Sequence, residues 1–202
     1  WNINPKENPI LKGHQGFVTD VNFSPNGKTV LSAGCDYTAR LWEKNGKLLN
    51  VLKRHSHYVV LNSQYTENGN KLLTSSDDGT IIIWDSLGKP LSTIQPNDNY
   101  IPFHFRTISN KLFIFTNYDD TLRLRDSSNK VFQTFPKTKL GKFSSDGNFI
   151  VTFSNDSALY FWKFTDKDFN PFEKNKSLKI KGESISDVDF SSTLTLLDIL
   201  LA

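Results

Sequence analysis

"FSPNGKTVLSAGCDYTARLW" at residues 23–42 has an outline that returns at 65–84 as "YTENGNKLLTSSDDGTIIIW" and at 143–162 as "FSSDGNFIVTFSNDSALYFW". Each of these twenty-residue stretches begins with an aromatic residue, has Gly at its fifth position and Asp at its fourteenth, and ends with Trp. A fourth, less regular copy at 106–125 keeps the Asp but ends with Arg. Similarity at a fixed period is the signature of a repeat architecture, so this stretch decides the fold.

The residues that close the copies, together with the Trp that begins the sequence, are spaced at 41, 42, 41 and 37 residues. They are Trp1, Trp42, Trp84, Arg125 and Trp162. The first full interval contains four strand-like segments, "FVTDVNF", "KTVLSAG", "ARLWEK" and "KLLNVLK". Asn-Gly and Asp-Gly steps between such segments provide the positive φ angles of tight hairpins. The sequence therefore predicts an all-β fold, a β-propeller of four-stranded antiparallel blades with about four full blades plus two part-blades.

The composition fits a globular β protein and narrows its partners. Aromatic residues, which favour strands, make up 13% of the chain. The net charge of +3 is too small for the concentrated basic face of a nucleic-acid-binding protein. No run approaches the roughly 18 apolar residues that a membrane helix needs. A single cysteine, Cys35, excludes an internal disulfide and suits a reducing compartment, so we expect a cytoplasmic location and neither nucleic acid nor membrane as partner.

Residues 11–47, "LKGHQGFVTDVNFSPNGKTVLSAGCDYTARLWEKNGK", resemble a WD repeat. The Gly-His pair at 13–14 corresponds to the GH dipeptide of that family, and Leu-Trp-Glu at 41–43 stands in place of its WD ending. "IIIWD" at 81–85 keeps both letters. The chain thus resembles the WD-repeat β-propeller family, specifically in repeats one and two and in degenerate form in repeats three and four. The linkers "WEKNGKLLNVL" and "WDSLGKPLSTI" are also similar to bacterial-type WD arrays.

The resemblance implies a structural hydrogen-bond network in each blade. In the family, a His from the loop before the first strand, a Ser or Thr, a turn Asp and the closing Trp are bonded in a chain. The matching positions of the first repeat are His14, Ser32, Asp36 and Trp42. Those of the second repeat are His55 (or His57), Thr74, Asp78 and Trp84, and the later repeats retain Asp119, Thr152, Asp156 and Trp162.

Catalytic and metal chemistry can be weighed on the same residues. The four turn Asp residues recur at one place in successive blades, so they are expected around the ring rather than as the close pair that two-carboxylate catalysis needs. A Ser–His–Asp triad could be composed from His14, Ser32 and Asp36, but nothing marks an activated Ser. His55 and His57 could form a metal pair, yet no third ligand is identifiable. No phosphate-binding glycine motif is present, and we predict no catalytic residue, metal or cofactor.

The resemblance also implies a partner-binding face. Propellers of this family bind peptides or protein surfaces, mostly on the face with the loops before the first strands and the turns before the third strands. The candidates on that face are Gln15, Phe17, Cys35, Tyr37, Tyr58, Asp77, Tyr100, Tyr118 and Asn155. We therefore expect a non-catalytic interaction scaffold or sensor in signalling. The alternative is a propeller enzyme or small-ligand-binding protein that uses the central channel, but the inner-strand segments show no shared charged constellation.

The repeat also suggests blade boundaries. Residues 1–12 are expected to be the outer strand of a preceding blade, and 182–202 the start of a further blade. Between them we place blades at 13–53, 54–96, 97–135 and 136–181. Either the chain is a fragment of a larger propeller, or its N-terminal strand closes a small ring. We favour the fragment, whose partners would include further blades or an effector domain of the same full-length chain.

Repeat three departs most from the pattern. Arg125 takes the place of the closing Trp, Phe115 that of the Ser or Thr, and Asn97-Asp98 that of the His. A network whose members depend on one another is better replaced as a group. Because a buried unpaired guanidinium is costly, we expect Arg125 either to pair with Asp119 or to extend its head to solvent.

Overall fold

The computed structural model describes residues 9–57, 59–95, 101–108, 111–118, 120–128, 130–144, 149–155, 158–164 and 172–179. Every regular element within these ranges is a β-strand. No helix among the described residues is long and apolar enough to cross a membrane. The chain divides into two compact units, Trp1–Phe103 and His104–Ala202.

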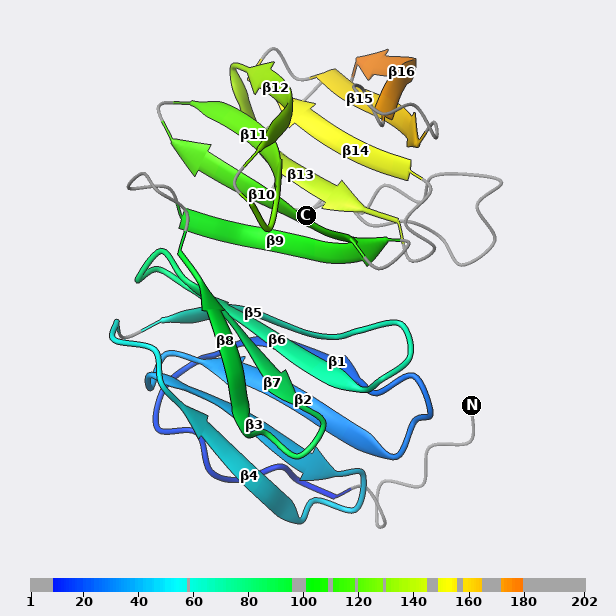
Figure 1. Ribbon diagram of the computed structural model, residues 1–202. Helices are drawn as coiled ribbons and strands as arrows, with labels where there is room; N and C mark the ends of the chain where they lie inside the picture. Colours follow the sequence, from blue (N-terminus) through cyan, green and yellow to red (C-terminus); the bar gives the residue numbers. More distant parts are fainter. Residues whose placement is uncertain are drawn as a thin grey trace. The chain divides into compact units, whose positions relative to one another are not determined.

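The first unit contains two four-stranded antiparallel sheets, each with its strands in chain order (Figure 1). We call them blade 1 and blade 2. Blade 1 consists of β1 (Val18–Phe23), β2 (Thr29–Gly34), β3 (Thr38–Glu43) and β4 (Leu48–Lys53). Blade 2 consists of β5 (Val60–Tyr65), β6 (Lys71–Ser76), β7 (Ile81–Asp85) and β8 (Pro90–Ile94).

The turns between these strands have the backbone that the Asn-Gly and Asp-Gly steps predict. Gly27 and Gly46 have φ angles of 66° and 97°, and Gly79 in the β6–β7 turn has 81°. At the matching place of the β2–β3 turn blade 1 has Tyr37, whose φ is 66°. A left-handed backbone is unusual for a bulky residue, so the repeat conserves the turn geometry even where its glycine is missing.

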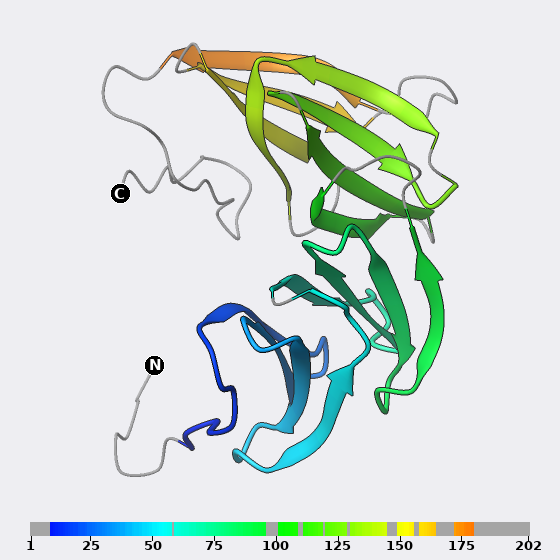
Figure 2. The same cartoon turned by 90° about the vertical axis from the view of Figure 1, so that its left-hand side faces the viewer.

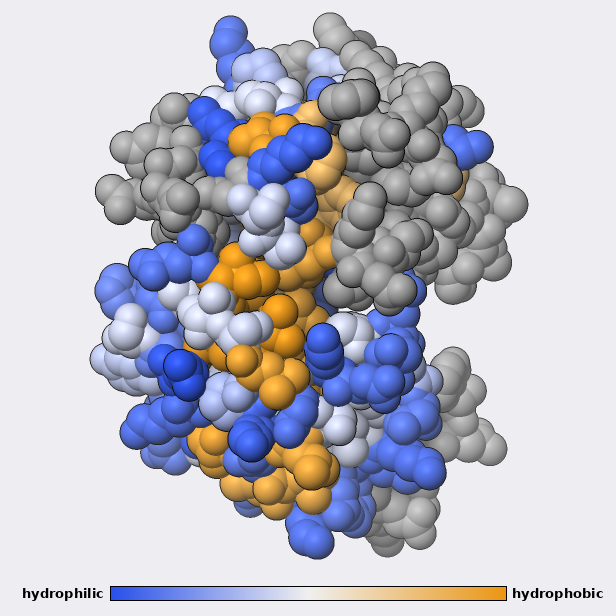
Figure 3. Space-filling view, in the orientation of Figure 1, coloured by the Kyte–Doolittle hydropathy of each residue, from blue (hydrophilic) through white to orange (hydrophobic). Residues whose placement is uncertain are grey.

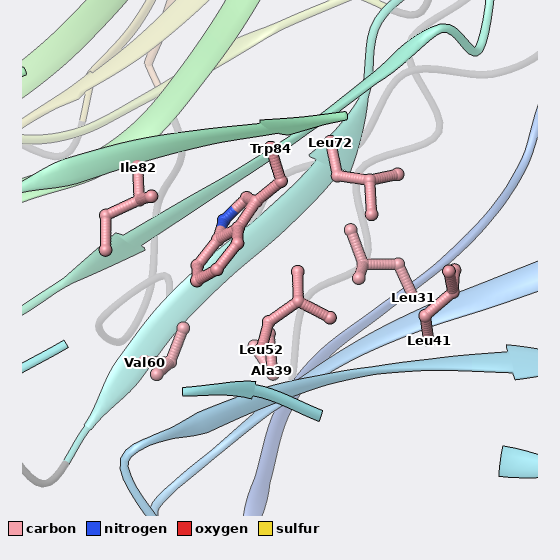
Figure 4. Close-up of a cluster of buried hydrophobic side chains, with 9 residues drawn as sticks. Leu31, Ala39, Leu41, Leu52, Val60, Leu72, Ile82 and Trp84 are labelled. Carbon is pink, nitrogen blue, oxygen red and sulfur yellow. The ribbon is translucent and has the colours of Figure 1, made fainter. Parts of the chain in front are cut away.

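The apolar core of the first unit lies between blades 1 and 2 (Figure 4). Because alternate residues of a strand share a face, Leu31 and Leu41 point toward blade 2, while Ser32 on the other side of β2 faces away from it. Figure 4 shows the side chains of both sheets directed toward one another. The cluster consists of Leu31, Ala33, Ala39, Leu41 and Leu52 from blade 1 and Val60, Leu72, Ile82 and Trp84 from blade 2.

The inner strands of the two blades, β1 and β5, are joined by side-chain hydrogen bonds. Asp20 Oδ2 accepts the backbone N–H of Ser63 at 2.8 Å, and Asn22 Nδ2 donates to the Ser63 carbonyl at 2.8 Å. Thr19 Oγ1 donates to the carbonyl of Val60. Burial raises the pKa of Asp20, against the lowering effect of the bonds from Ser63 and Asn22. Side chains of β1 therefore satisfy backbone groups of β5 that no strand ladder reaches.

The second unit also contains two four-stranded antiparallel sheets, blades 3 and 4 (Figure 2). The strands of blade 3 are β9 (Ile101–Ile108), β10 (Lys111–Tyr118), β11 (Thr121–Asp126) and β12 (Val131–Pro136), of which β9 begins just before the division between the units. The strands of blade 4 are β13 (Thr138–Phe143), β14 (Phe149–Ser154), β15 (Ala158–Phe164) and β16 (Phe172–Lys179).

Aromatic side chains build the interior of the second unit. Phe115, at the place of the Ser or Thr, is fully buried, and its ring centroid lies 4.7 Å from that of Phe143. Phe135 and Trp162 meet edge to face at 4.9 Å. Such aromatic pairs contribute about 0.5–1.5 kcal/mol beyond the area they bury. In blade 3, aromatic packing around Phe115 therefore occupies the place of the hydroxyl that blades 1 and 2 have in β2 and β6.

Arg125 corrects one sequence-based expectation. Only 6% of the residue is exposed, so the alternative in which its head extends to solvent is wrong. Arg125 lies in β11 opposite Ile114 of β10. The other alternative involves Asp119, which lies outside the described residues.

The four sheets confirm the predicted all-β fold with four full antiparallel blades. The part-blade expected at 182–202 lies outside the described residues, as do residues 1–8 of the part-blade expected at 1–12. The described remainder of that segment, residues 9–12, has no strand.

Candidate functional site

A chain of hydrogen bonds runs through blade 1, from a histidine before β1 to a tryptophan in β3. His14 Nδ1 lies 2.9 Å from Asp36 Oδ2, and His14 Nε2 lies 2.8 Å from Ser32 Oγ. The Trp42 indole Nε1–H donates to the same Ser32 oxygen at 2.9 Å. The structure thus brings together the four residues that the first repeat places in its network.

The chemistry of the four groups fixes the direction of each bond. An indole N–H can only donate, and a carboxylate can only accept. Ser32 Oγ therefore accepts from Trp42, and His14 Nδ1 donates to Asp36. In the neutral imidazole with its proton on Nδ1, Nε2 accepts the hydroxyl proton of Ser32.

Blade 2 repeats the arrangement with threonine in place of serine. Thr74 Oγ1 lies 2.8 Å from His55 Nε2 and accepts the Trp84 indole N–H at 3.0 Å. His55 Nδ1 lies 3.1 Å from Asp78 Oδ2. Of the two histidines considered for this position, the structure therefore uses His55, whereas the side chain of His57 is exposed.

Asp36 is the electrostatic centre of the network in blade 1. Its Oδ2 accepts the backbone N–H of Gln15 at 2.9 Å, and its Oδ1 accepts the Thr38 hydroxyl at 2.6 Å. Burial alone would raise the pKa of Asp36, but the hydrogen bonds from Thr38, Gln15 and His14 outweigh it and lower the pKa below the ordinary 3.8. The carboxylate is therefore held in its charged form, and it fixes the loop before β1 to the β2–β3 turn.

The second network shows the same balance. Burial opposes ionisation of Asp78, but the hydroxyl of Thr80 and the backbone N–H groups of Ser56 and Thr80 lower its pKa. Burial lowers the pKa of His55 below 6.5, although the neighbouring Asp78 acts in the opposite direction. The lowered pKa values of His55 and Asp78 favour a neutral imidazole beside a charged carboxylate.

The later blades retain less of the network. In blade 4 the Trp162 indole N–H donates to Thr152 Oγ1 at 3.0 Å, as in blades 1 and 2. Asp156 of this blade and Asp119 of blade 3 lie outside the described residues. In blade 3, Phe115 and Arg125 have replaced the hydroxyl and the indole.

The distances among Ser32, His14 and Asp36 are those of a catalytic triad, but the surroundings differ from those of an active site. Ser32 is buried, and its oxygen already accepts the indole N–H of Trp42. A nucleophilic hydroxyl needs access to a substrate and a nearby group that can stabilise the developing charge. The same geometry recurs in blade 2 around the buried Thr74, which is the behaviour of a structural element.

The candidate partner-binding residues of blade 1 lie together at one end of the sheet. The backbone N–H of Cys35 donates to the Phe17 carbonyl at 2.8 Å, which ties the β2–β3 turn to the loop before β1. Gly16 permits this approach, because a Cβ there would lie 2.0 Å from the Cys35 carbonyl oxygen. Phe17 is 86% exposed and Tyr37 is 43% exposed, while Cys35 is half-buried and Gln15 is exposed.

Blades 2 and 4 form the same backbone bond. Asp77 N–H donates to the Val59 carbonyl at 3.3 Å, and Asn155 N–H donates to the Lys137 carbonyl at 2.7 Å. Asp77 is half-buried and Asn155 is exposed. Of the remaining candidates, Tyr58 and Tyr100 lie outside the described residues, and only the backbone of Tyr118, at the end of β10, is described.

Sequence reasoning missed the threonine that follows the turn Asp by two positions. Thr38 and Thr80 each donate a hydroxyl to that Asp at 2.6 Å. The signal was present as "DYT" at 36–38 and "DGT" at 78–80. Arg40 was also missed; its guanidinium donates to Asp36 Oδ2 at 3.4 Å. In the part of the chain that the structure describes, no group of three or more His, Cys, Asp or Glu side chains could hold a metal ion.

Comparisons with known proteins agree with this geometry. The family model described as "WD domain, G-beta repeat" matches residues 6–43 and 46–85. The chain is 37% identical over 62 residues to nuclear distribution protein nudF 2 of Talaromyces marneffei, and 43% identical over 54 residues to a WD repeat-containing protein of Synechocystis sp.. The matches cover 29% and 25% of this chain, and 14% and 16% of those proteins.

Among solved structures, the WD40 beta propeller domain of Doa1 is similar, with a TM-score of 0.69 at 25% identity. That likeness covers 91% of this chain and 60% of the Doa1 chain. The chain therefore spans only part of the proteins that it resembles.

Proposed function

Because this chain belongs to the WD-repeat β-propeller family, we propose that it is a non-catalytic scaffold or sensor module that binds a protein or peptide on one face of its blades. The supporting observation is the exposed pair Phe17 and Tyr37, presented beside a network whose polar groups are consumed in holding the two loops. Aromatic side chains with rigid supports are the usual energetic anchors of protein interfaces. The face therefore presents exposed aromatic side chains on loops that the buried hydrogen bonds hold in place.

Tyr37 supports the proposal from its backbone. Its φ of 66° is at the place where blade 2 has Gly79. The left-handed region costs a non-glycine residue about 1 kcal/mol or more, and such strain is typically retained at functional sites. The first repeat therefore keeps a large aromatic side chain, 43% exposed, at a position where blade 2 has glycine.

The polar network supports the non-catalytic part of the proposal. The hydroxyl, imidazole and carboxylate that could perform acyl transfer are each used in buried structural bonds. None of the described contacts favours the central-channel enzyme over the interaction module. We further propose a cytoplasmic location, a signalling role of the bacterial-type array, and further blades or an effector domain as additional partners within a longer chain.

A peptide-display selection against the 202-residue chain tests the proposal. Tyr37→Gly should weaken the selected peptides at least about tenfold, which is 1.4 kcal/mol, while keeping or raising the thermal midpoint. Phe17→Ala should weaken them similarly with an unchanged midpoint. Leu91→Ala is the matched control, because Leu91 is an exposed apolar residue of β8, a strand over which Figure 3 shows apolar surface.

Two results would count against the proposal. Selected peptides that bind Phe17→Ala and Tyr37→Gly as well as the parent would remove the face from consideration. A selection that yields no binder, together with a hydrolase activity that is lost in Ser32→Ala, would favour the enzyme.

A further inference from the structure

The end of blade 1 that presents the exposed aromatic pair is rich in cations. We call this region the loop end of blade 1; it comprises residues 13–17, 35–38 and 53–54, and the guanidinium of Arg40 reaches it by donating to Asp36. Its charged residues are the three cations Arg40, Lys53 and Arg54 and the single carboxylate Asp36. The loop end of blade 1 therefore has a net positive charge.

The same end of blade 2 has the opposite charge. Positions 42 residues further along the chain are equivalent in blade 2, where Ile82 takes the place of Arg40 and Gln95 that of Lys53. Residues 77–78 of the equivalent turn are both Asp. Among the described residues at this end of blade 2, which are 55–57, 59 and 77–80, none is Lys or Arg. The two repeats thus keep one backbone and reverse the charge that it presents.

Two of the cations in blade 1 are free to meet a partner. The Arg40 guanidinium donates to Asp36 Oδ2 at 3.4 Å and to Thr38 Oγ1 at 3.3 Å, and the side chain is only 12% exposed. Lys53 and Arg54 are exposed, and neither forms an ion pair with another residue that the structure describes. Because the Asp36 carboxylate is buried in its own hydrogen bonds, a molecule that approaches this end meets positive charge first.

These accessible cations lie beside the aromatic pair. Lys53 is the cross-strand partner of Thr38, the residue after Tyr37. Phe17 lies on the other side of the blade, directly before β1, and the strand order is β1-β2-β3-β4. Neighbouring strands are about 4.8 Å apart, so about 14 Å separates the first strand from the fourth. An extended peptide, which rises about 3.3 Å per residue, crosses that distance in about four residues.

We propose that the loop end of blade 1 binds an acidic peptide segment. One apolar side chain of the segment contacts Phe17 and Tyr37. Asp or Glu side chains about four residues away pair with Lys53 and Arg54. This inference rests on the proposed function and adds the chemistry of the partner.

The charge of blade 2 limits the length of the acidic stretch. Like charges that meet across an interface suppress binding, and the half-buried carboxylate of Asp77 stands at the end of the neighbouring blade. Acidic residues are therefore expected on one flank of the apolar anchor, over Lys53 and Arg54, and not on the flank over Asp77. A nucleic acid strand is negative along its whole length, so it matches this divided surface less well than a peptide does.

Three display libraries of short peptides test the inference. Each peptide has one Leu or Phe at its centre, and the libraries differ only in one flank, which is rich in Asp and Glu, in Lys and Arg, or in Ser and Asn. At about 0.1 M salt, binders to the 202-residue chain should come from the acidic library at least about tenfold more often than from either of the others, because complementary charge selects the partner.

Charge-neutral variants identify the cations that the selected acidic peptides use. The double variant Lys53→Gln/Arg54→Gln should bind these peptides about threefold to tenfold more weakly at about 0.1 M salt, since exposed ion pairs contribute modestly. The difference should fall below about twofold at about 1 M salt, where the screening length is about 3 Å. Lys28→Gln/Lys71→Gln is the matched control, because these exposed lysines lie beside the β1–β2 and β5–β6 turns, and it should change the affinity less than about twofold.

The outcomes separate this inference from the proposed function. Binders that are lost in Phe17→Ala but come equally from all three libraries would overturn the acidic partner and leave the proposed function standing. The absence of binders from every library would overturn both. An oligothymidylate that binds more tightly than the acidic peptides, and that is lost in Lys53→Gln/Arg54→Gln, would overturn the inference in favour of nucleic acid.

Discussion

Thr74→Val tests the network where it is most buried. The substitution keeps the shape of the side chain and removes one oxygen, which accepts the Trp84 indole N–H at 3.0 Å and lies 2.8 Å from His55 Nε2. Thr74 and Trp84 are buried to 0% and 2% exposure, so water cannot replace the lost partner. An unsatisfied buried polar group costs about 1–3 kcal/mol.

Two groups lose their partner in this variant, and they are neighbours, so their costs are not additive. We expect the free energy of unfolding to fall by about 2–4 kcal/mol, which lowers the urea midpoint of the first unit by about 1 M or more for typical slopes. Far-UV circular dichroism and tryptophan fluorescence, followed together, measure this midpoint. Thr93→Val is the matched control, because Thr93 is exposed on β8, and its effect should stay within about 0.5 kcal/mol.

A double-mutant cycle with Trp84→Phe sharpens the test. In the Trp84→Phe background the hydroxyl of Thr74 has only His55 as a partner. Thr74→Val should therefore lower the free energy of unfolding less in that background than in the parent chain. Loss of less than about 0.5 kcal/mol in Thr74→Val, or additive losses in the cycle, would refute the view that the hydroxyl joins the two partners.

Acidification should weaken the fold in two steps, measured as the thermal midpoint between pH 8 and pH 3. His55 has a lowered pKa in the folded state, so the unfolded chain binds the proton first and stability is lost as pH falls below 6.5. Asp36 and Asp78 also have lowered pKa values, so the stability that they provide above 3.8 is lost as pH falls through their folded pKa values. A midpoint that stays flat from pH 7.5 to 5 would contradict the first step. Gly34→Ala should lower the free energy of unfolding by about 1–3 kcal/mol, because a Cβ at this position would lie 2.7 Å from His14 Nδ1. An unchanged urea midpoint would contradict this expectation and would mean that the loop of His14 moves aside without loss of stability.

The sequence predicted the elements of the fold because their causes are local. Period-two alternation and Asn-Gly turns recur at a fixed spacing, so a single repeat such as residues 23–42 already contains the strand–turn–strand order. The members of each network were predicted from the resemblance to the WD-repeat family, with His55 or His57 left open in the second repeat. Their pairwise separations, from His14 to Trp42 and from His55 to Trp84, are the same to within one residue.

What could not be predicted depends on neighbours outside the repeat. The bond between Asp20 and Ser63 requires the register of two adjacent sheets, which no pattern within one blade specifies. The left-handed backbone of Tyr37 contradicts its own residue type and follows only from the turn around it. The residue type of Arg125 left two alternatives open, pairing with Asp119 or extension to solvent, and its burial in the folded sheet excludes the second.

Positions that are the same in successive repeats hold the fold together, whereas positions that differ between repeats can serve recognition. His, hydroxyl, Asp and Trp stay the same in blades 1 and 2 because each is the partner that another buried group requires. At the end of the sheet, the backbone bond between the two loops is also constant, but its side chains change from Phe17 and Cys35 in blade 1 to Val59 and Asp77 in blade 2. A conserved backbone with varying side chains lets each blade present a different chemical group at an equivalent place. Specificity for a partner is therefore expected in the residues at which the repeats differ.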